Sequence, residues 1–390
     1  MDTGALKDSW KLVAKSGDEV PLFFYSHLFL SHPELREMFP ISMSAQRDKL
    51  VGALGAVVSN VEHLDDVVPI LQQLGRDHRR FAVVAEHYPA VGASLLATLQ
   101  YFLGPQWTES LAAEWAGAYG LVAKVMVQAA EEVADSSPSW WVADVVGVER
   151  RTLDVAVVQI RPQQQFEYRS GQSFAMEIPQ RPRLWRYYSP ANAPRDDGSI
   201  ELHVQVVAGG QVSSGIARSL RENDSVRLGA PIGESLVRPS DDRNDLLMIA
   251  GGTGLSPLRA VLEEIDRVWQ ATAQAPRVHL FHGVRWPWSL YEHERLISLA
   301  QHRPWFEYTP VVSDDSSYPG VRGLVGAVAA QSPSRSGRRV MVCGSPSMVK
   351  HSYGELTRSG VPRDEIRYEE FAAAGISDEG TENTGTGDVK

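Results

Sequence analysis

The chain has 390 residues, of which 43% are hydrophobic and 22% charged, and a formal net charge of -10 at pH 7. A chain of this length is too long to fold around a single hydrophobic core, so we expect three domains. The acidic balance argues against nucleic acid as a partner. The single cysteine, Cys343, excludes an intramolecular disulfide and a four-thiolate iron–sulfur centre, and favours a cytoplasmic protein.

The N-terminus lacks the basic head and apolar run of a signal peptide. No stretch approaches the ~20 apolar residues of a transmembrane helix. Peripheral contact with a membrane or lipid is compatible with this composition.

Residues 3–133 carry apolar side chains at three- and four-residue spacing, as in Leu6, Trp10 and Val13. This is the period of helices that share one core. Proline-containing breaks divide the pattern at residues 31–33, 39–40 and 104–105. The first third of the chain is therefore predicted to be an all-helical domain.

A polar segment with a proline, residues 135–139, ends the helical pattern, and strand-like sequence follows. Residues 155–160, 171–176 and 202–206 predict a small antiparallel barrel. Arg186-Tyr187-Tyr188-Ser189 ends one strand, where a ring can lie against a planar cofactor while guanidinium and hydroxyl hold phosphate. The alternative is an ordinary charged, aromatic strand end. Without the preceding Arg-Tyr-Tyr-Ser segment, Gly209 and Gly210 would be interpreted as a hairpin turn.

Residues 246–250 form an unbroken apolar run, as in a parallel strand covered on both faces. A glycine-rich turn and a helix predicted from about 257 to 270 follow, and strand, turn and helix together indicate nucleotide binding. Strands predicted at 278–282, 306–312, 340–343 and 366–368 alternate with helices and favour a doubly wound sheet. In this region Arg285 can meet a nucleotide phosphate or only solvent, and Cys343 can equally be a small buried hydrophobe.

In this order, the Arg-Tyr-Tyr-Ser segment and the two glycine-rich turns resemble the ferredoxin-reductase-like module that passes electrons between a nicotinamide and FAD. Residues 33–40, PELREMFP, resemble the globin turn in which a Phe packs on the haem. Together, over nearly the whole chain, the motifs resemble the flavohaemoglobin family. The resemblance implies an all-α globin domain (1–136), an antiparallel β-barrel FAD-binding domain (137–240), a doubly wound α/β NAD(P)-binding domain (241–375) and a disordered tail (376–390).

The resemblance implies that His78 is the axial ligand of a haem b iron and that Tyr88 hydrogen-bonds toward it from the proximal side. On residue type alone, a lone helix histidine is more often a surface residue. The family's proximal Glu falls on Ala130 here, and Glu131 would need a local bulge to replace it. Asp77 stands where the family usually has a basic residue.

On the distal side, the resemblance implies that Tyr25 and Gln46 donate hydrogen bonds to bound oxygen and that Phe39 and Leu50 wall the haem. Without it, Tyr25 and Phe39 would be packing residues and Gln46 a solvated one. Tyr25, Gln46, His78 and Tyr88 form the implied catalytic set.

The resemblance implies two further groups of cofactor contacts. FAD would be held by Arg186, Tyr187, Tyr188, Ser189, Gly209, Gly210, Gln211, Val212 and Ser213. NADH or NADPH would be held by Gly252, Thr253, Gly254, Ser256, Pro257, Cys343 and Gly344, with Phe371 shielding the flavin ring where the nicotinamide enters. Ser235 replaces an aromatic residue that the family has near the flavin.

The activity that the resemblance implies is hydride transfer from NAD(P)H to FAD, electron transfer to haem, and reaction of O2 with nitric oxide to give nitrate. One alternative keeps haem and FAD but uses another donor, such as D-lactate, or another acceptor, such as a peroxide or quinone, because Ala130, Asp77 and Ser235 depart from the pattern. A second is non-catalytic O2 or NO binding or sensing, against which the reductase motifs count. The expected partners are O2, NO and a nicotinamide nucleotide, with the chain a monomer or weak dimer.

Overall fold

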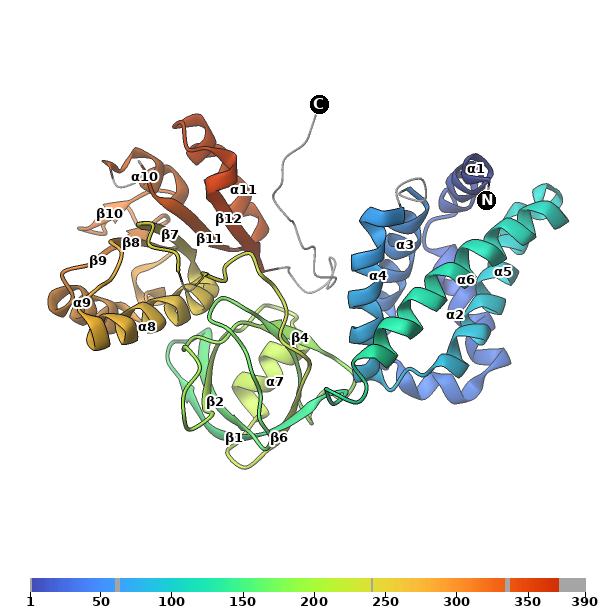
Figure 1. Ribbon diagram of the computed structural model, residues 1–390, viewed down its shortest axis with the longest axis horizontal. Coiled ribbons are helices and arrows are strands. Elements are labelled where there is room, and N and C mark those ends of the chain that lie inside the picture. Colours follow the sequence, from blue (N-terminus) through green and yellow to red (C-terminus); the bar gives the residue numbers. More distant parts are fainter. Residues whose placement is uncertain (1, 60–63, 240, 334–336, 372–390) are drawn as a thin grey trace. The chain divides into compact units, whose positions relative to one another are not determined.

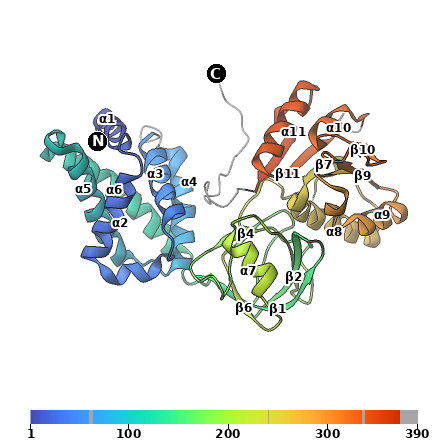
Figure 2. The same cartoon turned by 180° about the vertical axis from the view of Figure 1, so that it is seen from behind.

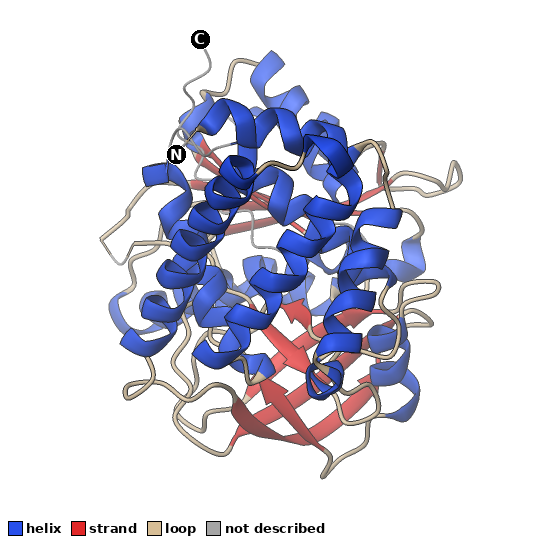
Figure 3. Cartoon of the chain, turned by 90° about the vertical axis from the view of Figure 1, so that its right-hand side faces the viewer, coloured by secondary structure: helices blue, strands red, loops and turns tan. Residues whose placement is uncertain are grey.

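A computed structural model describes residues 2–59, 64–239, 241–333 and 337–371. The predicted disordered tail, residues 376–390, lies outside the described residues. The chain forms two compact units that divide between Trp140 and Trp141. Helices build the first unit, and strands, drawn red in Figure 3, belong to the second. None of the described helices is both long and apolar enough to cross a bilayer.

The first unit is helical, as predicted. Its elements are α1 (Thr3–Ala14), α2 (Glu19–Ser31), η1 (Pro33–Met38), α3 (Ser44–Ser59), α4 (Leu64–His78), η2 (Arg79–Phe81), η3 (Ala85–His87), α5 (Tyr88–Leu103), η4 (Gly104–Gln106) and α6 (Glu109–Glu132). Side-chain caps begin two of them: Asp2 accepts from the Ala5 amide and Thr108 from the Leu111 amide. The periodic residues Leu6, Trp10 and Val13 are buried in one core with side chains of α2 and α5.

The second unit begins with an antiparallel barrel, also as predicted. Its elements are β1 (Trp141–Arg150), β2 (Val155–Pro162), β3 (Phe174–Glu177), β4 (Arg186–Tyr188), β5 (Ile200–Gln205), α7 (Gln211–Ser219) and β6 (Ser225–Leu228). The strand order is β4-β3-β6-β1-β2-β5, and a bridge between Pro190 and Leu202 brings the two edges together. The helix α7, seen against the barrel in Figure 2, adds Val212 and Ile216 to its core.

A parallel sheet with helices on both faces completes the second unit (Figure 1). Its elements are β7 (Leu246–Gly251), η5 (Gly252–Gly254), α8 (Leu255–Thr272), β8 (Val278–Val284), η6 (Pro287–Ser289), α9 (His293–His302), β9 (Phe306–Val312), β10 (Val321–Arg322), α10 (Val325–Gln331), β11 (Arg339–Gly344), α11 (Pro346–Arg358), η8 (Arg363–Glu365) and β12 (Ile366–Glu370). The order β10-β9-β8-β7-β11-β12 reverses direction at β7, which is the switch point where doubly wound sheets bind ligands.

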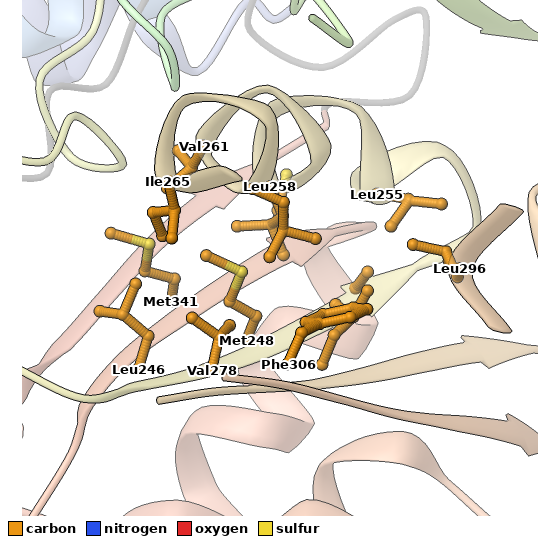
Figure 4. Close-up of a cluster of buried hydrophobic side chains, with 14 of the residues drawn as sticks. Leu246, Met248, Leu255, Leu258, Val261, Ile265, Val278, Leu296, Phe306 and Met341 are labelled. Atoms are coloured by element: carbon orange, nitrogen blue, oxygen red, sulfur yellow. The ribbon is translucent and has the colours of Figure 1, made fainter. Parts of the chain in front are cut away.

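The predicted doubly wound sheet is confirmed by its two cores. One lies under α8 and α9 and contains Met248 and Leu258 (Figure 4). The other lies under α10 and α11 and contains Ile249. The first core also takes Val155 and Leu236 from the barrel region, so the barrel and the parallel sheet share buried apolar surface.

One local expectation needs correction, and one alternative interpretation is excluded. The helix after the second glycine-rich turn begins at Leu255 and not near 257, because Pro257 is accommodated in the first helical turn, where its missing N–H costs nothing. Gly209 and Gly210 do not form a hairpin turn, because the helix α7 follows them directly.

Candidate functional site

His78 is the last residue of α4, and a backbone carbonyl fixes the protonation of its ring. Its Nδ1 atom lies 2.7 Å from the carbonyl oxygen of Leu74. Because a carbonyl oxygen can only accept, Nδ1 carries the proton and Nε2 keeps its lone pair. Burial lowers the pKa of His78 in spite of that hydrogen bond, so the ring is neutral at pH 7. This neutral form, with Nε2 as the free nitrogen, is the one that binds haem iron.

The backbones of α4 and α6 touch one turn before this histidine. A Cβ atom on Gly75 would lie 2.2 Å from the carbonyl oxygen of Met126, so only glycine permits the contact. Arg79 donates to the carbonyl oxygens of Val133 and Ser137 at 3.3 and 2.6 Å. The end of α4 is thereby held against the end of α6.

The residues predicted on the proximal side differ in their surroundings. Tyr88 is half-buried among apolar side chains of α4 and α6, which raises the pKa of its hydroxyl. Its carbonyl oxygen accepts a 2.7 Å hydrogen bond from Tyr119. The helix α6 continues without a bulge to Glu132, and Glu131 is exposed. Glu131 therefore does not take over the role of the acid missing at Ala130.

Asp77, the second departure on this side, is engaged within α4 and its C-terminal turn. It accepts from the Gln73 amide at 3.2 Å and lies 3.6 Å from the Arg80 guanidinium. Both side chains of the ion pair are largely buried. The negative charge of Asp77 is thus balanced by the positive charge of Arg80, next to the predicted axial ligand.

The four distal residues gather in one cluster. The Tyr25 hydroxyl donates to the backbone carbonyl oxygen of Gln46 at 3.3 Å. This distance is long for an O–H···O bond, so the bond is weak. The Phe39 ring meets the Tyr25 ring edge-on at 5.6 Å, and Leu50 is partly buried in the same core. Burial raises the pKa of Tyr25, which keeps its hydroxyl a donor.

The predicted flavin seat lies on β4 and just after it. Ser189 is 4% exposed, and its hydroxyl has no hydrogen-bond partner within the described ranges. An unsatisfied buried hydroxyl costs about 1–3 kcal/mol, so a bound polar group would stabilise it. Arg186 donates to the Trp185 carbonyl oxygen at 2.8 Å, and Tyr187 and Tyr188 are half-buried. The residue set therefore fits FAD.

The predicted phosphate loop leads into the N-terminus of α7. Gly209 has a φ of +76°, and Gly210 caps the helix. The hydroxyl oxygen of Ser213 accepts from the Val207 amide at 3.2 Å, which leaves its proton for another acceptor. The first amides of a helix have no partner within it, so the amides of Gln211 and Val212 suit a phosphate.

The segment around Ser235, which lacks the family's aromatic residue, is held by an ion pair. Glu234 forms an ion pair with Arg169 and accepts from the Gln172 amide at 3.4 Å. Ser235, at the position of the missing ring, is half-buried.

The turn between β7 and α8 is packed against the end of β11. A Cβ atom on Gly254 would lie 2.2 Å from the carbonyl oxygen of Cys343. Gly251 pairs in parallel register with Gly283 of β8. The predicted donor Ser256 gives its proton to the Thr253 carbonyl oxygen at 2.9 Å, within the turn itself. Its predicted donation to a pyrophosphate would thus replace this bond.

The remaining predicted residues of this site differ in accessibility. The thiol of Cys343 is fully buried in the core under α8, as the alternative reading had it, and only its backbone faces the turn. Phe371 donates its amide to the Gly344 carbonyl oxygen at 2.7 Å and packs against the same core. Arg285 is 81% exposed and pairs with Asp314 at 3.1 Å.

A buried ionic network between the barrel and the parallel sheet was missed by sequence reasoning. Glu201 of β5 contacts His203 at 3.0 Å and Arg259 of α8 at 2.8 Å, and Arg259 reaches Glu292 at 3.3 Å. Burial opposes ionisation of Glu201, but His203 and the arginines lower its pKa to about 2. The sequence signal that could have revealed this network is the pair Glu201 and His203, two polar residues that flank Leu202 within an otherwise apolar strand.

The comparisons with known proteins match three successive parts of the chain. The globin family model matches residues 22–126, the oxidoreductase FAD-binding domain residues 145–236, and the oxidoreductase NAD-binding domain residues 248–353. The flavohemoprotein of Bacillus subtilis is 25% identical over 387 residues, covering 94% of this chain and 95% of its own length. That of Bordetella bronchiseptica is 26% identical over 318 residues, covering 77% and 78%.

Two solved structures resemble the fold. The flavohemoglobin of Malassezia yamatoensis with bound FAD and heme matches with a TM-score of 0.74 and 16% identity, covering 95% of this chain and 98% of its own. The ferredoxin reductase of carbazole 1,9a-dioxygenase matches with a TM-score of 0.53 and 27% identity, covering 61% and 71%.

Fold, site and matches together define an oxidoreductase in which a haem-binding globin is joined to an FAD- and NAD-binding reductase module. In domain order and over nearly its whole length, the chain resembles the flavohaemoglobin family. The resemblance stated from the sequence, the fold class and the cofactors haem, FAD and nicotinamide nucleotide are thereby confirmed.

Proposed function

We propose that this protein is a nitric oxide dioxygenase, with NAD(P)H as electron donor. The observation that carries the proposal is the neutral His78 ring, whose Nδ1 proton is donated to Leu74 so that Nε2 is the free nitrogen. When bound, FAD supplies the conversion of a hydride into single electrons, and haem supplies the O2 chemistry. The reaction balances as NO plus O2 plus one electron to nitrate.

The side chains of the helical unit have proposed roles around that chemistry. Tyr25 keeps its proton and, with only a weak bond to Gln46, can turn its hydroxyl toward O2 in the distal pocket. Phe39 and Leu50 exclude water and limit access. Tyr88, which packs among apolar residues of α4 and α6, would hydrogen-bond toward His78 from the proximal side.

The reductase side has proposed binding roles. Arg186 and Ser189 hold FAD, the latter by satisfying its buried hydroxyl. The amides that begin α7 hold the FAD phosphates. The glycine-rich turn after β7 would hold the nucleotide pyrophosphate, and Phe371 would shield the flavin ring on the side where the nicotinamide enters.

The test is NO consumption by the purified protein loaded with haem and FAD. Anaerobic NADH should first bleach the flavin band and then reduce haem. In air, NO should disappear as nitrate forms, with NADH, a two-electron donor, consumed at half the rate of NO. NADH-independent loss of NO, or nitrite as the main product, would contradict the proposal.

A second candidate activity uses the same cofactors with another donor or acceptor. It is favoured by the exposed Glu131, which leaves the proximal acid unreplaced, and by the Asp77–Arg80 pair beside His78. D-lactate, a quinone and a peroxide should be compared with NADH and NO in stopped-flow experiments. Flavin bleaching by D-lactate that outpaces bleaching by NADH would favour this candidate.

A further inference from the structure

Two tryptophans stand on the loop that follows β8. Trp286 and Trp288 flank Pro287 at the start of η6, and their rings are parallel, with centroids 5.2 Å apart and an interplanar angle of 2°. They are 39% and 61% exposed. Indole rings bury large apolar area when they pack, so an exposed, stacked pair favours a ligand that covers it.

The position of this pair follows from the sheet register. Gly283 of β8 lies opposite Gly251 of β7, and all strands here are parallel. The loop after β8 and the glycine-rich turn after β7 therefore leave the same carboxyl edge of the sheet, one strand apart. Ligands of doubly wound sheets bind along this edge.

The direction of the nucleotide follows from the strand order. The residues proposed for the nicotinamide end, Gly344 and Phe371, belong to the end of β11 and the segment after β12. β11 and β8 are the two neighbours of β7, on opposite sides. A dinucleotide whose pyrophosphate lies at the turn and whose nicotinamide lies toward β11 must direct its adenosine toward β8.

The tryptophan loop is held at both ends. Before it, the Arg285 side chain contacts Asp314 at 3.1 Å, and the Asp314 amide donates to the Arg285 carbonyl oxygen at 2.9 Å. After it, Leu290 and Tyr291 are buried, and the Tyr291 hydroxyl lies 2.8 Å from His203. Anchored ends reduce the entropy lost when a ligand orders the loop.

We propose that the Trp286–Trp288 pair is a stacking platform for the adenine ring of the nicotinamide nucleotide. The assignment rests on the proposed placement of the nucleotide and goes beyond it by naming an adenine subsite. Adenine is a flat π-system, and base–aromatic stacking is the contact that a parallel, exposed indole offers. Since adenine is common to both nucleotides, the platform serves NADH and NADPH alike.

The test uses the haem- and FAD-loaded full chain with two donors. NADH carries adenosine, whereas reduced nicotinamide mononucleotide lacks it. Trp288→Ala should raise the KM for NADH about tenfold with kcat nearly unchanged, which matches the loss of one stacked base. The KM for the mononucleotide should not change. Trp288→Phe should restore most of the affinity for NADH, because it keeps a π-face.

The matched control is Val268→Ala, which removes an exposed apolar side chain near the other end of α8. It should leave both KM values unchanged. An unchanged KM for NADH in Trp288→Ala, or an equal rise for both donors, would overturn the platform while leaving the NAD(P)H activity in place. Failure of the unmodified protein to accept electrons from NADH would instead overturn the proposed function.

Discussion

The candidate haem residues come from separate helices, whereas the candidate nucleotide residues lie mainly in one short turn. Tyr25 belongs to α2, Gln46 to α3 and His78 to α4, each positioned by side-chain packing and single hydrogen bonds. The turn between β7 and α8 is instead shaped by glycines against the backbone of β11. A site made by backbone can be recognised from a continuous motif, whereas a site made by dispersed side chains is recognised from sequence only through resemblance to a family.

The largest expected effect concerns the axial ligand. His78→Ala should abolish the haem Soret band and leave flavin bound, because iron loses its protein ligand while the second unit is untouched. Absorption spectra of the purified variant would show this. His32→Ala, which removes a half-buried histidine of the same unit, is the control and should keep the band. A Soret band that persists in His78→Ala would refute the ligand assignment.

Arg186→Ala should have the opposite effect, loss of flavin with haem retained. Loss of the guanidinium should lower the affinity for FAD at least about tenfold, while the haem Soret band remains. Flavin fluorescence after gel filtration measures the bound fraction. Arg181→Ala, at an exposed position before β4, provides the matched loss of charge. Equal flavin retention in both variants would show that Arg186 does not hold FAD.

One close backbone contact, between Gly75 of α4 and Met126 of α6, also stabilises the helical unit. Gly75→Ala should destabilise the helical unit by about 1–3 kcal/mol and weaken haem retention, because its Cβ would overlap the Met126 carbonyl oxygen. Gly120→Ala, in open space on α6, should be neutral or stabilising. Thermal unfolding followed at the Soret band compares them. Similar midpoints would mean that α4 and α6 can shift apart without cost.

The smallest expected effect is a pH dependence in the second unit. Burial raises the pKa of Glu369 on β12 from 4.5 to about 7, although a hydrogen bond with Ser173 opposes the shift. The folded state therefore holds a proton that the unfolded state has lost, and stability falls as pH rises from about 4.5 to about 7.

Glu369→Gln should remove this loss. At pH 8 the variant should be more stable than the unmodified chain by on the order of 1 kcal/mol, and at pH 4 nearly equal to it. Urea unfolding of the FAD-loaded protein at the two pH values measures the difference. Glu370→Gln, on the same strand and exposed, is the control. Parallel pH profiles for the two variants would exclude Glu369 as the titrating group.

The strands of the parallel sheet were predicted from sequence nearly to their ends. The run 306–312 is β9 as observed, and 278–282 falls short of β8 by two residues. Strands buried on both faces have continuous apolar sequence, which is visible without the fold. The start of α7 was not predicted, because glycines precede hairpin turns and helices alike and only the packing of Val212 and Ile216 into the barrel selects the helix.

The sequence by itself determined the three types of domain and the two glycine-rich turns, because periodicity and turn chemistry are local properties of the chain. The candidate haem residues came instead from the resemblance to the flavohaemoglobin family. The tertiary structure alone decided that Leu74 fixes the protonation of His78, that Glu131 faces solvent, and that Glu201, Arg259 and Glu292 join barrel and sheet. Contacts between residues far apart in the sequence, helix orientation and burial set these features, and none of them leaves a periodic signal.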